Sequence, residues 1–238
     1  LISDTDNDIL YQTSDKDFLT NKTINYRDPY INLDIEWNKK FILNDKDNKS
    51  EFTKSIDYIL MGSNGFLGSE IEKCLKEQNK NYIVLNTRLE NYEELEYKLK
   101  IYKPKFLICA AGISGKPTIE WCENNKEETF KTNVIDTLKL CEITKKLNIH
   151  LTLFGSGSIY KGLYDNENNP ILIKNTEGCK ENKNNERFYL KCRNILEESI
   201  ELYNNVLYLR IQYPISLNEN PKCFMNKMLS RLDTIHEQ

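Results

Sequence analysis

The sequence is poor in histidine, lacks a long apolar run and lacks a basic cluster, and each of these features excludes a class of function. Its two histidines, His150 and His236, form no ligand cluster, so no metal site is expected. No apolar run approaches the length of a membrane span, and no signal peptide is recognisable. The basic residues are interspersed with acidic ones, and the net charge is -3. We therefore expect neither nucleic acid nor a membrane as a partner.

The cysteines are scattered and odd in number, which is not typical of a disulfide framework. There are seven, and none forms a CxxC pair. Such thiols indicate a reducing compartment, the cytoplasm, with cysteine serving mainly as a small buried apolar residue. The chain begins with Leu1 rather than methionine, which suggests a piece of a longer protein.

Residues 55 to 211 alternate short apolar runs with segments of helical periodicity. The apolar runs predict five strands, "SIDYILMG", "NYIVLN", "KFLICAAG", "IHLTLFGSGS" and "NVLYLRIQ". The segments between them predict helices in "GSEIEKCLKEQNK", "NYEELEYKLKIYK", residues 119–147 and residues 186–203. Buried strands that alternate with helices predict an α/β fold of the Rossmann type, a doubly wound parallel sheet.

Residues 1 to about 50 do not share this alternation. They contain short β-like or irregular segments rich in Asp and Asn, and "NDKDNKSEF" resembles a polar connector. We therefore expect residues 1–50 to be the end of another domain and residues 55–238 to be the Rossmann domain. A solvent-exposed extension that packs on the Rossmann surface is the alternative.

The first predicted strand is followed directly by a glycine-rich turn, "GSNGFLG". Gly62, Gly65 and Gly68 are spaced G-x-x-G-x-x-G, and Phe66 and Leu67 lie between the last two. Glycines at a strand-to-helix turn let a pyrophosphate approach the backbone, and the helix N-terminus then offers its free N–H groups. Three glycines can also mark an ordinary turn, but their place between strand and helix predicts dinucleotide binding.

The end of the second strand bears on the choice of cofactor. An acid there usually holds the ribose hydroxyls of NAD, whereas an arginine can pair with the 2′-phosphate of NADP. In "VLNTRLEN" Arg88 comes first and Glu90 follows. We therefore expect NADP(H), with NAD(H) as the second choice, although Arg88 can also be read as an ordinary solvated cation.

The candidate catalytic residues lie in "LFGSGSIY" and "ERFYLKCRN". Ser156 and Ser158 end the fourth strand, at the sheet edge where ligands bind in open α/β folds. Tyr189 and Arg193 are one helical turn apart on one face, whereas Lys191 points to the other side. A tyrosine beside a cation is a candidate proton donor, although the same spacing also occurs on ordinary surface helices.

This chain resembles the extended short-chain dehydrogenase/reductase superfamily. The resemblance lies in the order of three features: the glycine-rich turn, the strand that ends in serines, and the tyrosine followed by a cation. The resemblance implies that Tyr189 donates a proton while the nicotinamide supplies a hydride. It also places Ala110 and Ala111 in the cofactor site and gives Asn133, in "KTNV", a supporting role. Arg193 stands where that family has lysine, and a planar guanidinium is not equivalent to an ammonium.

A narrower resemblance covers residues 58–230. "RLENYEELEYKL", "AAGISGKPTIEWCE", "FYLKCRNILEE" and "NPKCFMNKM" are similar to segments of the nucleotide-rhamnose epimerase-reductases and the dTDP-4-dehydrorhamnose reductases. This implies NADPH-dependent reduction of a 4-keto sugar to a nucleotide-linked L-rhamnose. It also implies that Ser156 binds substrate and that Lys227 matches the epimerase acid. Ser158 replaces the cysteine base of bifunctional members, and serine is a poorer base, so epimerisation is expected elsewhere.

The front of the chain resembles the last part of the cupin-type dTDP-4-dehydrorhamnose 3,5-epimerases. The resemblance lies in "LYQTSDKDFLTNKTINYRDPYINLDIEWNKKFILNDKD". It implies that Tyr11 matches the catalytic tyrosine and Asp47 the aspartate that orients the histidine. Residues 1–50 would then belong to an epimerase domain fused to the reductase.

The expected function is thus an NADPH-dependent oxidoreductase of nucleotide-sugar metabolism. A non-catalytic nucleotide-binding Rossmann module is one alternative, and an epimerase or dehydratase of the same branch is another. The sequence leaves open whether the sugar carries dTDP or UDP, and whether the protein forms a homodimer.

Overall fold

The computed structural model describes residues 56–116, 118–157, 163–164, 170–171, 187–212, 214–216, 223 and 225–226. Residues 1–55 and 56–238 form two units, and all described residues belong to the second.

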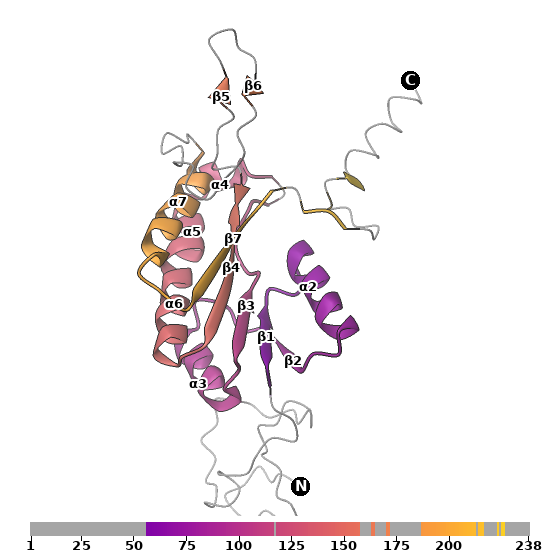
Figure 1. Ribbon diagram of the computed structural model, residues 1–238. Helices are drawn as coiled ribbons and strands as arrows, with labels where there is room; N and C mark the ends of the chain where they lie inside the picture. Colours follow the sequence, from indigo (N-terminus) through magenta and orange to yellow (C-terminus); the bar gives the residue numbers. More distant parts are fainter. Residues whose placement is uncertain are drawn as a thin grey trace, which may run out of the picture. The chain divides into compact units, whose positions relative to one another are not determined.

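A five-stranded parallel sheet forms the centre of this unit (Figure 1). Its strands are β1 (Tyr58–Met61), β2 (Tyr82–Leu85), β3 (Phe106–Cys109), β4 (His150–Ser156) and β7 (Val206–Ile211). They are arranged in the order β2-β1-β3-β4-β7, and all four pairings are parallel. All carboxyl ends therefore lie at one edge, where open sheets of this kind bind ligands. The predicted Rossmann-type fold is confirmed.

Helices flank the sheet on both sides. Helix α2 (Phe66–Glu77) lies on one side in Figure 1, whereas α3 (Tyr92–Tyr102), α6 (Thr137–Lys146) and α7 (Phe188–Ile200) lie on the other. A separate pair of two-residue strands, β5 (Leu163–Tyr164) and β6 (Pro170–Ile171), is antiparallel and was not predicted.

The core lies on both faces of the sheet, because neighbouring strand residues such as Ile59 and Leu60 point to opposite faces and both are fully buried. Its fully buried side chains come from strands and helices alike: Ile59, Leu60, Leu95, Leu99, Leu107, Leu140, Leu151 and Leu196. Each apolar side chain removed from water contributes about 1.5–3 kcal/mol to folding. This packing fixes the sheet edge against α7.

The segment predicted as one helix over residues 119–147 is interrupted. It consists of α4 (Trp121–Asn124), α5 (Lys126–Phe130), a π-helical stretch η1 (Lys131–Asp136) and α6. The break is at Asn125, whose φ of -127° and ψ of 54° are not helical and whose side-chain amide donates to the Trp121 carbonyl over 2.8 Å. An asparagine that bonds to nearby backbone competes with the helix in this way.

Candidate functional site

The glycine turn after β1 is too crowded for side chains. Gly62 has a φ of +82°, which favours glycine, and a Cβ there would lie 2.5 Å from the Ala111 nitrogen. A Cβ at Gly68 would collide with the Gly62 carbonyl oxygen, to which the Gly65 N–H also donates over 3.1 Å. The turn and the segment after β3 are therefore packed backbone against backbone, and this brings Gly62, Ala110 and Ala111 together.

Helix α2 begins within this turn, at Phe66 rather than at the predicted Gly68. The first N–H groups of a helix, here those of Phe66 and Leu67, have no intrahelical acceptor. The first turn contains no acidic residue, so its positive dipole end is not compensated from within the helix. Together with the bare glycine backbone, this end of α2 fits an anionic phosphate.

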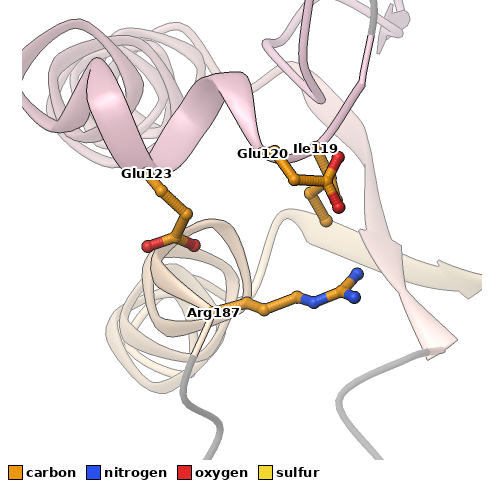
Figure 2. A pocket seen from close by; sticks show the side chains of 4 residues that line it. All are labelled: Ile119, Glu120, Glu123 and Arg187. Atoms are coloured by element: carbon orange, nitrogen blue, oxygen red, sulfur yellow. The ribbon is translucent and has the colours of Figure 1, made fainter.

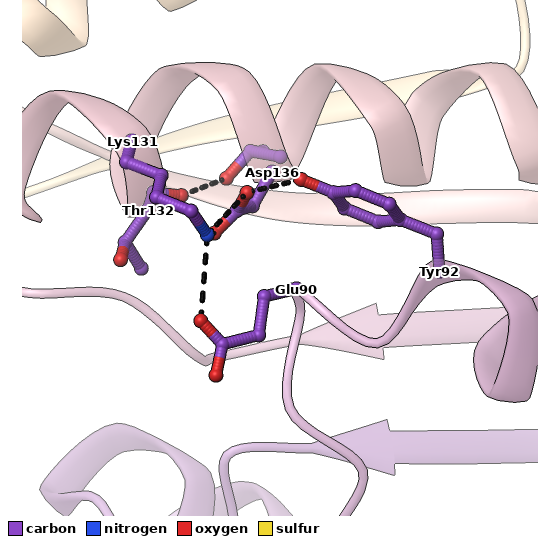
Figure 3. Close-up of polar contacts among 6 residues, drawn as sticks. Glu90, Tyr92, Lys131, Thr132 and Asp136 are labelled. Carbon is purple, nitrogen blue, oxygen red and sulfur yellow. Dashed lines mark hydrogen bonds and ion pairs between the residues drawn. The ribbon is translucent and has the colours of Figure 1, made fainter.

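The loop after β2 carries the two residues predicted to select the cofactor, and Figure 3 shows one of them, Glu90, with its contacts. Arg88 is exposed. The Glu90 carboxylate accepts from Lys131 over 3.3 Å, and Lys131 also bonds to the buried Asp136 at 3.1 Å. Tyr92 donates to Asp136 over 2.5 Å, and this bond raises the pKa of Tyr92. Glu90 is thus tied to a network that joins the loop to η1, whereas the Arg88 guanidinium lies at the surface.

Tyr189 and Arg193 are brought together on α7, as the sequence predicts. The Arg193 Nε donates to the Tyr189 hydroxyl over 3.1 Å, and the guanidinium carbon lies 5.1 Å from the centre of the tyrosine ring. Lys191 is exposed. Arg193 is therefore the cation that faces the phenol oxygen, and it can stabilise negative charge there when the proton is given up.

The charge of Arg193 is maintained by its surroundings. Burial alone would lower the pKa of Arg193, but the interactions with Tyr189 and Tyr208 outweigh this effect and raise it. Tyr208 lies on β7, and its hydroxyl oxygen is buried. The guanidinium therefore remains positive over the whole working range of pH.

The backbone after β3 contacts the tip of Arg193. A Cβ at Gly112 would lie 3.1 Å from Arg193 Nη2 and 3.3 Å from Asn133 Oδ1. Asn133 is fully buried on η1 and holds the next residue by two bonds: its Oδ1 accepts from the Ile113 N–H over 2.9 Å and its Nδ2 donates to the Ile113 carbonyl over 2.7 Å. The supporting role predicted for Asn133 is confirmed.

Tyr189 is held by an apolar cluster and by a helix cap. Its side chain is 9% exposed and packs with Cys122 and Leu190. The Glu123 carboxylate accepts from the Phe188 N–H over 2.6 Å at the start of α7. The position of the phenol is thus fixed from α4, which carries both Cys122 and Glu123.

A cleft of about 230 Å³ lies at this end of α7 (Figure 2). It is lined by Ile119, Glu120, Glu123 and Arg187. Figure 2 shows the guanidinium of Arg187 pointing towards the Glu120 carboxylate. The pKa of Glu120 is lowered, chiefly by a hydrogen bond from Thr118 and in part by the charge of Arg187. The cleft offers donors on Arg187, two residues before Tyr189, and acceptors on Glu120 and Glu123.

Ser156 is the last residue of β4 and lies at the carboxyl edge of the sheet, paired in register with Ile211. The residue before it, Gly155, is covered by Tyr208, since a Cβ there would lie 2.6 Å from the Tyr208 hydroxyl oxygen. Ser156 therefore lies at the predicted edge.

Three of the buried thiols have pKa values well above neutral pH. Burial raises the pKa of Cys109 to about 11, although the charge of Arg193 opposes the shift. Burial likewise raises the pKa of Cys141 to about 12 and that of Cys192 to about 11. None of these three is a thiolate nucleophile.

Over the described residues, no three His, Cys, Asp or Glu side chains are grouped as metal ligands. None of the helices in that part of the chain is long and apolar enough to cross a membrane.

Some predicted residues lie outside the described part of the chain, namely Lys227, Ser158, Tyr11 and Asp47. The structure also reveals residues that sequence reasoning missed. Gly112 and Tyr208 border Arg193, and Glu123 caps α7. Of these three, only Gly112 had a sequence signal, as the last residue of "AAG" after a predicted strand. Tyr208 and Glu123 had none, because contacts between distant segments leave no periodic pattern in the sequence.

A protein-family model described as the NAD dependent epimerase/dehydratase family matches residues 58–213. The chain belongs to this family. Its glycine turn and its tyrosine helix both lie within the matched residues.

Relatives within the epimerase/dehydratase family include two proteins of Arabidopsis thaliana. The bifunctional dTDP-4-dehydrorhamnose 3,5-epimerase/dTDP-4-dehydrorhamnose reductase is 30% identical over 180 residues, which cover 74% of this chain and 58% of the relative. The trifunctional UDP-glucose 4,6-dehydratase/UDP-4-keto-6-deoxy-D-glucose 3,5-epimerase/UDP-4-keto-L-rhamnose-reductase RHM2 is 31% identical over 193 residues, which cover 79% of this chain and 28% of the relative. The expected resemblance to rhamnose epimerase-reductases is confirmed, and the chain spans only part of each relative.

Among solved structures, the L780 UDP-rhamnose synthase of Acanthamoeba polyphaga mimivirus is similar to this epimerase/dehydratase chain. The two share 27% identity with a TM-score of 0.65, over 74% of this chain and 63% of that protein.

Proposed function

We propose that this chain is the reductase part of an enzyme that converts a nucleotide-linked 4-keto-6-deoxy sugar into a nucleotide-linked L-rhamnose, with NADPH as reductant. The observation that carries the proposal is the contact between Arg193 Nε and the Tyr189 hydroxyl at the carboxyl edge of a Rossmann sheet. The names of the Arabidopsis relatives and of the viral UDP-rhamnose synthase supply the substrate class.

Different residues of the chain have different roles in the proposed reaction. The backbone of Gly62, Gly65 and Gly68, with the first N–H groups of α2, holds the pyrophosphate of the cofactor. When bound, the nicotinamide supplies a hydride to the carbonyl carbon of the sugar. Tyr189 gives its proton to the carbonyl oxygen, so that the C=O bond becomes an alcohol, and Arg193 stabilises the phenolate that is left.

The substrate lies between the sheet edge and the cleft beside Tyr189 in this proposal. Ser156 donates a hydrogen bond to the carbonyl oxygen of the sugar. Glu120 and Arg187 line the cleft and offer an acceptor and donors to hydroxyl groups. Lys227, matched only by resemblance, contributes the acid of a 3,5-epimerase if that activity is present.

The loop after β2 favours NADPH over NADH. The Glu90 carboxylate is engaged by Lys131, so it is not free to hold the ribose hydroxyls, whereas the exposed Arg88 can pair with a 2′-phosphate. Arg88→Ala should therefore lower the ratio of kcat/KM for NADPH to that for NADH by roughly tenfold or more, since a hydrogen bond to a charged group is worth about 1.5–3 kcal/mol. Lys76→Ala, at the far end of α2, is the control.

The proposal also covers the preceding domain, the oligomeric state and the cellular location. Residues 1–50 are the end of a cupin-like 3,5-epimerase domain in the same chain, and the assembly is a homodimer. The cytoplasm is its location, in line with six free cysteines among the described residues. Sedimentation at several protein concentrations tests the dimer.

The function is tested by following NADPH oxidation at 340 nm with a nucleotide-4-keto-6-deoxyglucose, with and without a separate 3,5-epimerase. Oxidation that requires the added epimerase is the expected result. NADPH binding without oxidation in either reaction would identify a non-catalytic nucleotide-binding module. Conversion of the sugar without net NADPH consumption would identify an epimerase or dehydratase.

A further inference from the structure

Arg193 occupies the position of a catalytic cation with a head group that is larger and flatter than an ammonium. A guanidinium needs more room beside the tyrosine, and its planar shape allows fewer orientations. The structure provides this room at one point on the backbone, because Gly112 has no side chain where Arg193 Nη2 lies.

Two segments lie next to the guanidinium, and a third interacts with it through its charge. Tyr189 accepts from Nε on its own helix, and the Gly112 backbone lies against Nη2. Tyr208 lies on β7 with its ring against Gly155 and its hydroxyl buried. The helix residue and the loop after β3 thus lie next to Arg193, and Tyr208 interacts with it electrostatically.

We infer that Gly112 is a positioning residue: its missing side chain allows Arg193 to lie with Nε on the Tyr189 hydroxyl, and Gly112 and Arg193 act as a coupled pair. The inference rests on the proposed reductase function for its kinetic consequence. The contact itself does not depend on that function.

The position of the loop makes this coupling specific. Asn133 fixes Ile113 by two hydrogen bonds, so the backbone at Gly112 cannot simply move aside. On its own helix, Arg193 is held by the bond from its Nε to the Tyr189 hydroxyl over 3.1 Å. A methyl group at position 112 would therefore be relieved mainly by movement of the guanidinium, away from the Tyr189 oxygen.

The test is a double-mutant cycle with Gly112→Ala and Arg193→Lys in the full chain. In the parent background, Gly112→Ala should lower kcat by roughly tenfold, because neighbouring residues that share a contact couple at this level. In the Arg193→Lys background the same change should lower kcat less than about twofold, since the smaller ammonium leaves room for a methyl group. An equal loss in both backgrounds would overturn the inference. The same result is expected if the added methyl group displaces only the Asn133 side chain, whose Oδ1 would lie 3.3 Å from it.

A second readout needs no turnover. The chain has six arginines, so a ¹⁵N-arginine-labelled sample gives few Nε–H signals, and that of Arg193 is assigned by its loss in Arg193→Lys. Gly112→Ala should shift this signal and speed its exchange with water, with little change in the signals of Arg88 and Arg187. An unchanged Arg193 signal would overturn the inference. If no variant, nor the parent, oxidises NADPH, the proposed function fails while this signal still decides the role of Gly112.

Discussion

At the scale of single residues, the candidate site depends on a few side chains and on a few missing ones. Tyr189 and Arg193, the proposed proton donor and its partner cation, are joined by a bond of 3.1 Å from the Arg193 Nε to the Tyr189 hydroxyl. Gly62 and Gly68 supply only backbone, because any Cβ there meets neighbouring main-chain atoms. Substitution of Tyr189 or Arg193 should therefore lower the catalytic rate, whereas substitution of Gly62 or Gly68 should lower the stability of the fold.

Tyr189→Phe should lower kcat by roughly 10²- to 10⁴-fold, since it removes the general acid while keeping the ring. The dissociation constant for NADPH should change less than about threefold, because the ring still packs against Cys122 and Leu190. Stopped-flow turnover and fluorescence titration measure the two quantities. Tyr203→Phe, beyond the far end of α7, is the matched control and should leave both unchanged. A kcat within about threefold of the parent would show that another group donates the proton.

Gly62→Ala should destabilise the domain by more than about 2 kcal/mol, because it combines a strained φ with a collision against Ala111. Gly65→Ala is the comparison, since its φ is -83° and its added Cβ meets only the Gly62 oxygen, at 3.3 Å. Urea unfolding of the three proteins gives the differences. Equal losses for the two alanine variants would show that the Gly62 turn can relax.

At the scale of elements, the helices on one face are joined to each other by charged side chains. Glu96 on α3 accepts from Lys100 on its own helix at 2.7 Å and from Lys146 on α6 at 2.6 Å. These hydrogen bonds lower the pKa of Glu96 to about 2. A carboxylate with a depressed folded-state pKa contributes stability above its unfolded-state pKa and loses it as the pH falls towards the folded-state value.

Glu96→Gln should cost roughly 0.5–1 kcal/mol at pH 7, the size expected of a partly exposed pair. The difference from the parent should shrink as the pH falls from about 4.3, where an unfolded glutamate takes up its proton, towards 2. Urea unfolding at pH 7, 4.5 and 3.5 measures it. Glu201→Gln is the control, at an exposed glutamate with no ion pair within the described chain. A difference that stays constant down to pH 3.5 would contradict the linkage.

At the scale of the whole molecule, the sheet and its helices protect most of the described thiols. Cys109, Cys122, Cys141, Cys192 and Cys223 are 0–3% exposed, whereas Cys74 on α2 is exposed. Reaction of Cys109 or Cys141 with a thiol reagent therefore requires both opening of the domain and loss of a proton whose pKa is raised by burial.

Cys74 should react with iodoacetamide within minutes, whereas Cys109 and Cys141 should react only from the small unfolded fraction of the domain. Their rates should rise together with urea and follow the global free energy of unfolding. Peptide mass spectrometry reports each site separately. Rapid labelling of Cys141 in native buffer would show that the α6 layer opens locally without unfolding of the sheet.

Much of this architecture was predictable from the sequence, for identifiable physical reasons. Short apolar runs that end in glycine marked β1 and β3, and the spacing of Tyr189 and Arg193 placed both on one face of a helix. The break at Asn125 was not predictable from periodicity, because residues 123–129 are all polar and such a stretch fits a solvated helix face as well as a break. The helix ends there through a local bond from the Asn125 side chain to the Trp121 carbonyl. The contact of Gly112 with Arg193 was missed because it joins the loop after β3 to α7.

The strand order also has a consequence in time, as the chain leaves the ribosome. β1 emerges first and takes a central place, β2 and β3 pair on its two sides, and β4 and β7 then extend one edge in the order of synthesis. No later strand has to be inserted between two that are already paired, so the sheet can grow during translation, at roughly 5–20 residues per second. The glycine turn is complete once β3 has docked, whereas Tyr189 and Arg193 arrive with the last helix. On the proposed function, the nascent chain completes its nucleotide-binding turn before it contains its proton donor, Tyr189.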